Sequence, residues 1–332
     1  MKRNRIAELD FLRSLATLLL LVHHSGIYQY QIGSFPLRNL SKYNNHLLLG
    51  AFVFISGYLT ARTLSRREIF HLSAFYRSRL LRLYPPYLVA LLSFVFLLGI
   101  RISSQEMLIH LMGLQVLLSP KYSDPIRTLW FISLLLIFFT FAPTLILSLK
   151  RIARLFAAYL TIFMITILIH NSIELLDIRF FYFFPTFAIG SLIGVAQALP
   201  VMKTSNSLLG GSLVGFSVGI LMLSQNNLTY IPDLDLLHIL WSNLFILSSI
   251  VIIFRSSHRL THFRFVQNLI LYIATSSYFT YLYHRPLWRI LYDISGIGVE
   301  RIEVLINLVS IPIVIAFAFI LQNLYKKIVE RI

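Results

Sequence analysis

One apolar segment near the start of the sequence carries residues that could do chemistry. Residues 11–22 are mostly apolar, yet Asp10, Arg13 and His24 lie in or beside them. Eleven helical residues return to within about 20° of the same face, so Arg13 and His24 would share one face. A titratable base that shares a helix face with a guanidinium is suited to general base catalysis or to covalent transfer of a group.

The depth of His24 in a membrane strengthens this interpretation. Arg13 and His24 would lie roughly 16 Å apart along the helix axis. If Arg13 is at the inner surface, His24 lies near the middle of a hydrocarbon core about 30 Å thick, where an ionisable residue indicates function. The alternative is a histidine that only hydrogen-bonds to neighbouring helices. His23 points about 80° away from Arg13 and is the weaker candidate, and Asp10 is placed to pair with Arg13.

The composition is that of a membrane protein. Of the 332 residues, 57% are hydrophobic and 13% are charged, whereas ordinary soluble chains carry about 25% charged residues. The net charge of +16 falls in short loops between apolar segments, which argues against a nucleic-acid partner. The absence of cysteine excludes disulfides, a catalytic thiol and a cysteine zinc site, and we expect neither a metal site nor a permanently bound cofactor.

The positions of the apolar segments predict an all-α integral membrane protein, a bundle of about ten transmembrane helices. Residues 107–118 are too short and too polar to span the membrane, and predict one short interfacial or re-entrant helix. We expect a single membrane-embedded domain over residues 1–332 without a separate soluble domain. The predicted spans are residues 11–28, 47–64, 84–100, 128–149, 155–171, 180–198, 207–225, 237–254, 267–285 and 303–325.

The loop charges orient these spans. With the N-terminus inside, the inner segments carry roughly twice as many lysines and arginines as the outer ones, as the positive-inside rule requires. Both termini are therefore expected in the cytoplasm, in a multi-pass protein that contacts membrane lipid.

A second candidate site is the basic run between the second and third predicted spans. Arg79 and Arg82 are three residues apart and would be neighbours on one helix face, with Arg77 close by. Like charges at that spacing repel, so an anionic partner such as a phosphate is expected. An ordinary positive loop lying on anionic lipid is the alternative. Pro85 and Pro86 would then set the start of the third span.

Three further residues are candidates for supporting roles. Ser56 stands beside Gly57, where small residues favour close helix packing. Trp130 opens the fourth span, and an interfacial anchor is its simplest interpretation. His284 follows several tyrosines at the outer end of the ninth span and could line an outer mouth, although an aromatic belt at the interface would explain the tyrosines equally well.

Taken in order along the chain, these motifs resemble the membrane acyltransferase 3 family. The most telling features are an arginine followed after ten residues by a histidine, and the pair Arg79 and Arg82. The motifs that carry the resemblance are Leu-Asp-Phe-Leu-Arg at 9–13 with His24, Phe-x-Phe-Ile-Ser-Gly-Tyr at 52–58, Phe-Tyr-Arg-x-Arg-Leu-Leu-Arg-Leu-Tyr-Pro at 75–85, Leu-Trp-Phe-Ile-Ser at 129–133 and Ser-Tyr-x-x-Tyr-Leu-x-His at 277–284.

The resemblance implies an O-acyltransferase of the bacterial cytoplasmic membrane. Such proteins move acyl groups, usually acetyl from cytoplasmic acetyl-CoA as co-substrate, onto hydroxyls of surface polysaccharides or their lipid-linked precursors. By motif, Arg13 and His24 match the active-site pair, while Arg79 and Arg82, helped by Arg77, match the residues that meet the donor's phosphates. Whether the histidine is general base or acyl carrier stays open.

The chain departs from many relatives at one position. Leu135 stands where they carry a glutamate, so the pattern resembles stand-alone members without an esterase-like domain. Two alternatives remain at this point. One is the same reaction with a succinyl or other acyl donor, and the other is a transporter or flippase for a lipid-linked sugar. Transporters often show repeated halves and broken helices, and we find no internal repeat in the sequence.

Overall fold

The computed structural model describes residues 5–65, 71–149, 151–225, 234–260, 263–295 and 300–330. The described residues are almost entirely helical, and their two short strands form one antiparallel hairpin. The fold class predicted from the apolar segments is therefore confirmed. The extreme ends of the chain lie outside these ranges, and the cytoplasmic placement of both termini stays a prediction.

The chain forms two compact units. The first contains Met1–Leu48, Leu81–Arg101 and Ser256–Ile332, and the second contains Leu49–Leu80 and Ile102–Arg255. The two units do not by themselves divide the chain into separate domains, and the single membrane-embedded domain stays a prediction.

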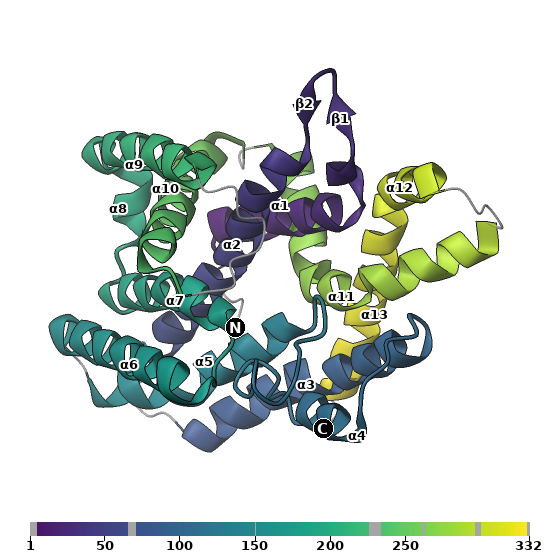
Figure 1. Ribbon diagram of the computed structural model, residues 1–332. Helices are drawn as coiled ribbons and strands as arrows, with labels where there is room; N and C mark the ends of the chain where they lie inside the picture. The colour runs from purple at the N-terminus through teal and green to yellow at the C-terminus, as the bar shows by residue number, and fades with distance from the viewer. Residues whose placement is uncertain are drawn as a thin grey trace. The chain divides into compact units, whose positions relative to one another are not determined.

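The first unit is built on three helices that pack in sequence-distant pairs. Helix α11 (Arg264–Ser295) packs against both α1 (Ala7–His24) and α13 (Ile311–Val329) (Figure 1). All three contribute apolar side chains to one core, which positions the polar residues that α1 and α11 also carry. The buried members of this core are Leu21, Ile273, Trp288, Val314 and Ile315.

The last predicted span is broken in the structure. Residues 303–325 were expected to form one helix, but α12 (Glu300–Val309) and α13 are separated at Ser310. Pro312 stands in the first turn of α13. A proline there needs no N–H donor, whereas in a helix interior it would remove a hydrogen bond and clash with the preceding turn. The chain therefore starts a new helix at this point.

Helix α3 (Leu72–Phe96) departs from prediction in the opposite way. The sequence predicted that Pro85 and Pro86 would start a span over residues 84–100, but the helix passes through both prolines. Proline at 85 leaves the carbonyl of Leu81 without its helical donor. The hydroxyl of Tyr325 donates a hydrogen bond to that carbonyl, which satisfies the group that the proline leaves free and lets the helix continue.

Between α1 and α2 (Arg38–Ser65) the chain makes a short 3-10 turn, η1 (Ile27–Gln29), and a hairpin of strands β1 (Gln31–Ile32) and β2 (Phe35–Pro36). Gly26 ends α1 with a φ of 92°, a left-handed conformation that favours glycine. The turn directly follows His24, so it fixes where the candidate base stands at the end of its helix.

The second unit is held together by aromatic side chains and close helix packing. Phe138 on α5 lies 4.5 Å, between ring centroids, from Phe187 on α7. A Cβ at Gly57 of α2 would come within 2.4 Å of the Phe187 carbonyl oxygen, so only glycine allows this approach. Besides most of α2 and the first part of α3, the helices of this unit are α4 (Ser104–Leu111), α5 (Trp130–Ser148), α6 (Ile152–Ile173), α7 (Ile178–Ala196), α8 (Leu199–Thr204), α9 (Asn206–Gln225) and α10 (Leu236–Leu260), the last of which ends in the first unit.

Helix α4 is the short helix expected before the fourth span. Ser103 and Glu106 form a capping box at its start, which satisfies two backbone donors. The helix ends at Leu111 rather than continuing to residue 118, because Gly113 adopts a φ of 69° that stops regular helix.

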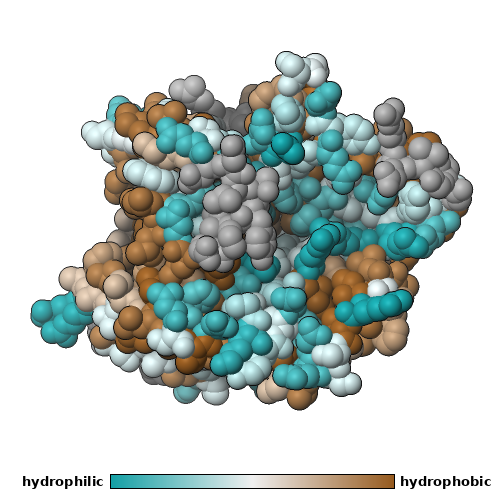
Figure 2. Space-filling model, in the orientation of Figure 1, coloured by the Kyte–Doolittle hydropathy of each residue, from teal (hydrophilic) through white to brown (hydrophobic). Residues whose placement is uncertain are grey.

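Eight helices in the described part of the chain are long and apolar enough to cross a membrane. They include α6 and α9, whose outward faces are largely apolar, and Figure 2 shows apolar side chains along the left of the visible face, where α8 to α10 lie in Figure 1. A helix overlaps most of every predicted span, with α12 and α13 sharing the last one. The two expected spans that fall outside the eight are α1 and α11, which carry the most polar candidates.

Candidate functional site

The first apolar segment folds as a single helix, α1, which contains both Arg13 and His24. No proline interrupts it, and its polar side chains bond inward. The hydroxyl of Ser14 donates to the backbone oxygen of Ile270 on α11 at 2.7 Å. This bond ties the two helices together one residue from Arg13. The eleven-residue spacing therefore acts within one uninterrupted helix, as the sequence predicted.

The end of α1 brings His24 against His284 of α11. Nδ1 of His24 lies 2.9 Å from Nε2 of His284, and the two rings are nearly parallel, with an interplanar angle of 12°. His284 is fully buried, while His24 is half-buried. Two imidazoles from segments far apart in sequence thus form one hydrogen-bonded pair.

The second ring nitrogen of His284 is also engaged. Nδ1 lies 3.0 Å from the backbone oxygens of both Thr280 and Tyr281, one turn earlier in α11. The ring also meets the edge of Trp288 at 5.2 Å between centroids, and Nε1 of Trp288 donates to Ser310 Oγ at 3.1 Å. These contacts hold the inner imidazole from both sides.

The opposite end of α1 gathers positive charge. Arg5, Asp10 and Arg82 all lie within electrostatic range of Arg13. Arg13 and Asp10 are half-buried, and Arg82 is exposed. Three guanidinium groups and one carboxylate leave a net positive cluster here, which favours an anionic ligand. The predicted closeness of Asp10 to Arg13 agrees with this arrangement, and Arg5 is a member that sequence reasoning counted only as a loop charge.

Tyrosine hydroxyls hold the α3 backbone beside Arg82. Tyr278 donates to the backbone oxygen of Leu83 at 2.5 Å, and Tyr283 donates to that of Pro86 at 2.8 Å. Both tyrosines are on α11. In the sequence they were compatible with an interfacial belt, whereas in the structure their hydroxyls position the segment that carries Arg82.

Two asparagines that the sequence did not single out hold the His24 end of α1. Asn44 donates from Nδ2 to the backbone oxygen of Leu19 and to the Tyr28 hydroxyl, at 3.1 Å and 2.7 Å. Asn307 donates from Nδ2 to the backbone oxygen of Ser25 at 3.2 Å. Carbonyls at a helix end lack helical partners, so the Asn307 amide fixes the turn that follows His24, while Asn44 ties α1 to Tyr28 just beyond that turn. A buried asparagine in a membrane helix was the signal that could have found them.

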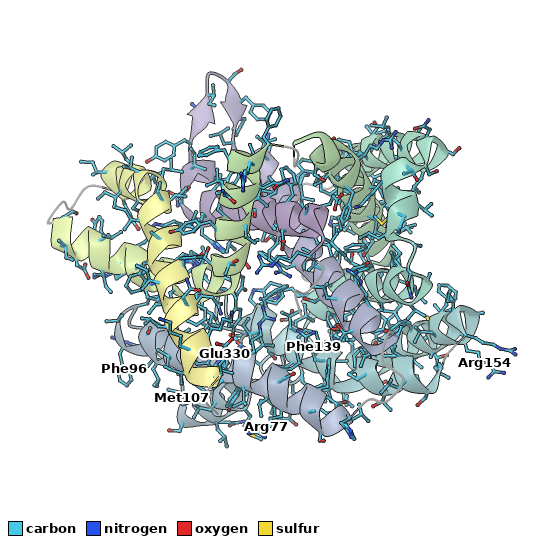
Figure 3. All side chains as sticks on the ribbon, turned by 180° about the vertical axis from the view of Figure 1, so that it is seen from behind. Arg77, Phe96, Met107, Phe139, Arg154 and Glu330 are labelled. Atoms are coloured by element: carbon cyan, nitrogen blue, oxygen red, sulfur yellow. The ribbon has the colours of Figure 1, made fainter. Side chains whose placement is uncertain are left out.

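The other two donor-binding candidates belong to the second unit. The guanidinium of Arg79 lies over the rings of Phe75 and Phe139, at 5.3 Å and 4.8 Å from their centroids. This stacking holds Arg79 by its planar group. Arg77 is exposed, and it is labelled on α3 in Figure 3 together with Phe139 on α5. Their binding of a donor stays a prediction.

Trp130 is buried in the second unit, and its placement at a membrane interface stays a prediction. Its ring stacks on Phe183, and the guanidinium of Arg179 lies 4.7 Å from its centroid. Arg179 in turn pairs with Asp177 at 2.7 Å. A cation held over a tryptophan face stabilises the ring inside the protein, so packing accounts for this residue.

The remaining candidates in this unit are apolar or locally bonded. Ser56 donates to the backbone oxygen of Phe52 at 2.8 Å within its own helix. Leu135 is buried. No cluster of three or more histidine, cysteine, aspartate or glutamate residues that could hold a metal ion occurs among the described residues.

Comparison with known proteins gives one match. A family model described as an acyltransferase domain, that of the membrane acyltransferase 3 family, matches residues 6–322. Neither the curated proteins nor the solved structures searched contain a match to this chain.

Proposed function

The chain belongs to the membrane acyltransferase 3 family, and from that membership we propose an O-acetyltransferase of the bacterial cytoplasmic membrane. The family makes the chain a multi-pass membrane acyltransferase. The proposal adds the substrates: acetyl-CoA as donor, and a hydroxyl of a cell-surface polysaccharide or its lipid-linked precursor as acceptor.

The observation that carries the proposal is the pair formed by His24 and His284. A neutral imidazole can take the proton of an acceptor hydroxyl or attack the thioester carbon itself. Burial favours the neutral form, because taking an imidazolium out of water is costly. His24 is half-buried and has one ring nitrogen held by His284, which leaves the other for chemistry.

The positive cluster at the start of α1 supports an anionic donor. Arg5, Arg13 and Arg82 gather there beside the carboxylate of Asp10. Coenzyme A carries a pyrophosphate and a 3′-phosphate, which arginine meets through charge-assisted, bidentate hydrogen bonds. We assign the donor's phosphates to this cluster, and the thioester arm to the length of α1 between Arg13 and His24; a donor contact at Arg79 and Arg77 rests on the motif resemblance alone.

The experiment is acetyl transfer from labelled acetyl-CoA by purified protein, followed as release of free CoA and labelled saccharide. Changing His24→Ala should lower turnover roughly 10²- to 10⁴-fold, the contribution typical of a positioned base. His71→Ala, at an exposed position, is the control and should leave turnover unchanged. Near-normal turnover in a correctly inserted His24→Ala variant would sink the mechanism.

The same experiment separates the alternatives. Faster CoA release with succinyl-CoA than with acetyl-CoA would keep the mechanism and change the donor. Movement of a labelled lipid-linked sugar across vesicles, with no CoA release from any donor, would support a transporter and overturn the proposal.

A further inference from the structure

His284 is buried in the apolar core of the first unit, yet both of its ring nitrogens have partners. Nδ1 faces the two backbone oxygens of Thr280 and Tyr281, and Nε2 faces Nδ1 of His24. Because each of these partners has a known capacity to donate or accept, the contacts fix where the protons are.

The backbone carbonyls determine which ring nitrogen of His284 carries its proton. A carbonyl oxygen can only accept, so Nδ1 of His284 carries the hydrogen and donates it. A neutral imidazole has one N–H, and the full burial of His284 disfavours a charged ring. Nε2 of His284 is therefore a bare acceptor.

The position of the proton on His24 follows from the position of the proton on His284. Since Nε2 of His284 accepts, Nδ1 of His24 must donate across the 2.9 Å contact. A neutral His24 then has no hydrogen left for its other nitrogen. Nε2 of His24 is left with its lone pair.

We propose that His284 is a positioning residue that holds His24 in the Nδ1–H tautomer, so that Nε2 of His24 is the atom that acts on substrate. This inference rests on the proposed function for its catalytic meaning, while the tautomer itself is a property of the resting protein. A histidine oriented through its other nitrogen is the arrangement that metal ligands and nucleophile-activating histidines use.

In the reaction, one nitrogen, Nε2 of His24, both takes up and gives back the transferred proton. As the acceptor oxygen bonds to the thioester carbonyl carbon, its proton moves to Nε2 of His24, which becomes an imidazolium. The carbon–sulfur bond of the tetrahedral adduct breaks, and the departing sulfur takes that proton to give CoA with a free thiol. During this step the Nδ1–H of His24 still donates to His284, which stabilises the transient positive charge.

The same lone pair serves the acyl-carrier route. Nε2 of His24 would bond to the carbonyl carbon as the thiolate leaves, and the acceptor hydroxyl would then displace the imidazole, its proton neutralising the thiolate. Both routes need a bare Nε2, so the role of His284 does not depend on which one operates.

The ring of His284 is itself fixed by its surroundings. Trp288 stands one helical turn further along α11, with its ring edge-on to His284 and its Nε1 hydrogen-bonded to Ser310. The Trp288 ring on one side and the two carbonyls on the other hold the imidazole in the orientation that directs Nδ1 at the carbonyls and Nε2 at His24.

The test has two readouts, one of which does not involve activity. Protein carrying ¹⁵N-histidine in lipid nanodiscs should show a His24 signal pair with a protonated Nδ1 and a bare Nε2, assigned by its loss in His24→Ala. A resting wild-type protein with His24 protonated at Nε2 would overturn the inference whatever the activity.

The second readout is turnover. His284→Leu removes the acceptor and should lower kcat roughly 10- to 100-fold, the usual cost of losing an orienting partner, with KM for acetyl-CoA unchanged. His284→Gln keeps an acceptor near the position of Nε2 and should recover most of kcat and the Nδ1–H signal. Equal kcat in the wild type and His284→Leu would contradict the positioning role.

A matched control exists in the second unit. His170 also directs Nδ1 at two backbone oxygens, those of Leu175 and Leu176 at 3.1 Å and 2.8 Å, so His170→Leu removes the same kind of bond. We expect kcat and the His24 signals to be unchanged in it. If no acyl transfer occurs but the His24 signals show Nδ1–H and depend on His284, the proposed function fails while the tautomer assignment stands.

Discussion

Among single residues, Arg82 gives the sharpest test of donor binding. It lies within electrostatic range of Arg13 and is itself exposed, whereas Arg79 is stacked on two phenylalanine rings and its loss would also disturb packing. Arg82→Ala should raise KM for acetyl-CoA roughly 10- to 100-fold with kcat little changed, because a hydrogen bond to a charged group is worth about 1.5–3 kcal/mol. Steady-state kinetics over a range of donor concentrations measures this.

Two further variants serve as an intermediate case and as a negative control for that measurement of KM. Arg82→Lys keeps the charge but not the bidentate geometry, so its KM should fall between those of wild type and Arg82→Ala. Arg154→Ala removes an exposed arginine of α6, labelled in Figure 3, and should change neither constant. A KM for Arg82→Ala equal to that of Arg154→Ala would remove Arg82 from the donor site.

For single residues, the sequence predicts which side chains share a face of one helix, but it does not predict contacts between residues on different helices. The face shared by Arg13 and His24 follows from helical periodicity, and α1 contains both. His284, 260 residues from His24, was assigned to an outer mouth, because no periodicity relates residues on different helices. The contact of Trp130 with the cation of Arg179 was missed for the same reason, since another segment supplies that cation.

Among the helices, the structure of α3 leads to a prediction about Pro85 and the hydroxyl of Tyr325. The carbonyl of Leu81 loses its helical donor to Pro85 and receives the Tyr325 hydroxyl instead. Tyr325→Phe should therefore destabilise the protein by about 0.5–1.5 kcal/mol. In a Pro85→Ala background the helical donor returns, so the same change should cost little. Thermal unfolding of the wild type and the three variants in detergent gives the coupling between the two sites.

Tyr283 supplies the control for that cycle. Its hydroxyl donates to the backbone oxygen of Pro86, and residue 90 can still donate to this oxygen along the helix. Tyr283→Phe and Pro85→Ala should therefore be additive. Additivity of Tyr325→Phe with Pro85→Ala would show that the hydroxyl does not replace the missing donor.

The helices show why proline is an ambiguous signal in a membrane sequence. Pro312 coincides with the break before α13, as a helix breaker should. Pro85 stands inside α3, where the hydroxyl of a distant tyrosine satisfies the carbonyl that this proline frees. In a bilayer such partners are required, and the sequence does not show which proline has one.

For the whole molecule, the membrane orientation can be tested directly. The chain has no cysteine, so single introduced cysteines report accessibility without background. Lys121→Cys, in a predicted outer segment, should react with a membrane-impermeant maleimide in intact cells. Thr204→Cys, in a predicted inner segment, should react only after the cells are permeabilised. Both positions are exposed.

The reverse labelling pattern would invert the orientation and place the positive cluster around Arg13 on the outer side, away from cytoplasmic acetyl-CoA. A control for insertion is the exposed lipid-facing position Leu168. Leu168→Cys lies mid-helix in α6 and should react poorly in both conditions, because a maleimide needs a hydrated thiolate.

The composition and the length of the apolar segments were enough to predict an all-α integral membrane protein, since 57% of the residues are hydrophobic and they gather in segments long enough to span a bilayer. It could not predict which helices would be the polar ones. Eight helices meet a simple hydropathy criterion, and α1 and α11 do not, because α1 carries Glu8, Asp10, Arg13 and two histidines, and α11 is rich in tyrosine, serine and threonine. The weakest membrane signals in the chain thus mark the helices that hold the candidate chemistry.

The hydrogen-bond chain that starts at His24 ends at two peptide oxygens. Those oxygens hold no exchangeable hydrogen and cannot pass one on, so His284 is a terminus rather than a relay. A proton collected at the substrate-facing nitrogen has to return to the departing sulfur. Acetyl transfer through this pair would therefore neither consume nor release protons on either side of the bilayer, and the energy of the thioester alone would drive it, independent of the cell's proton gradient.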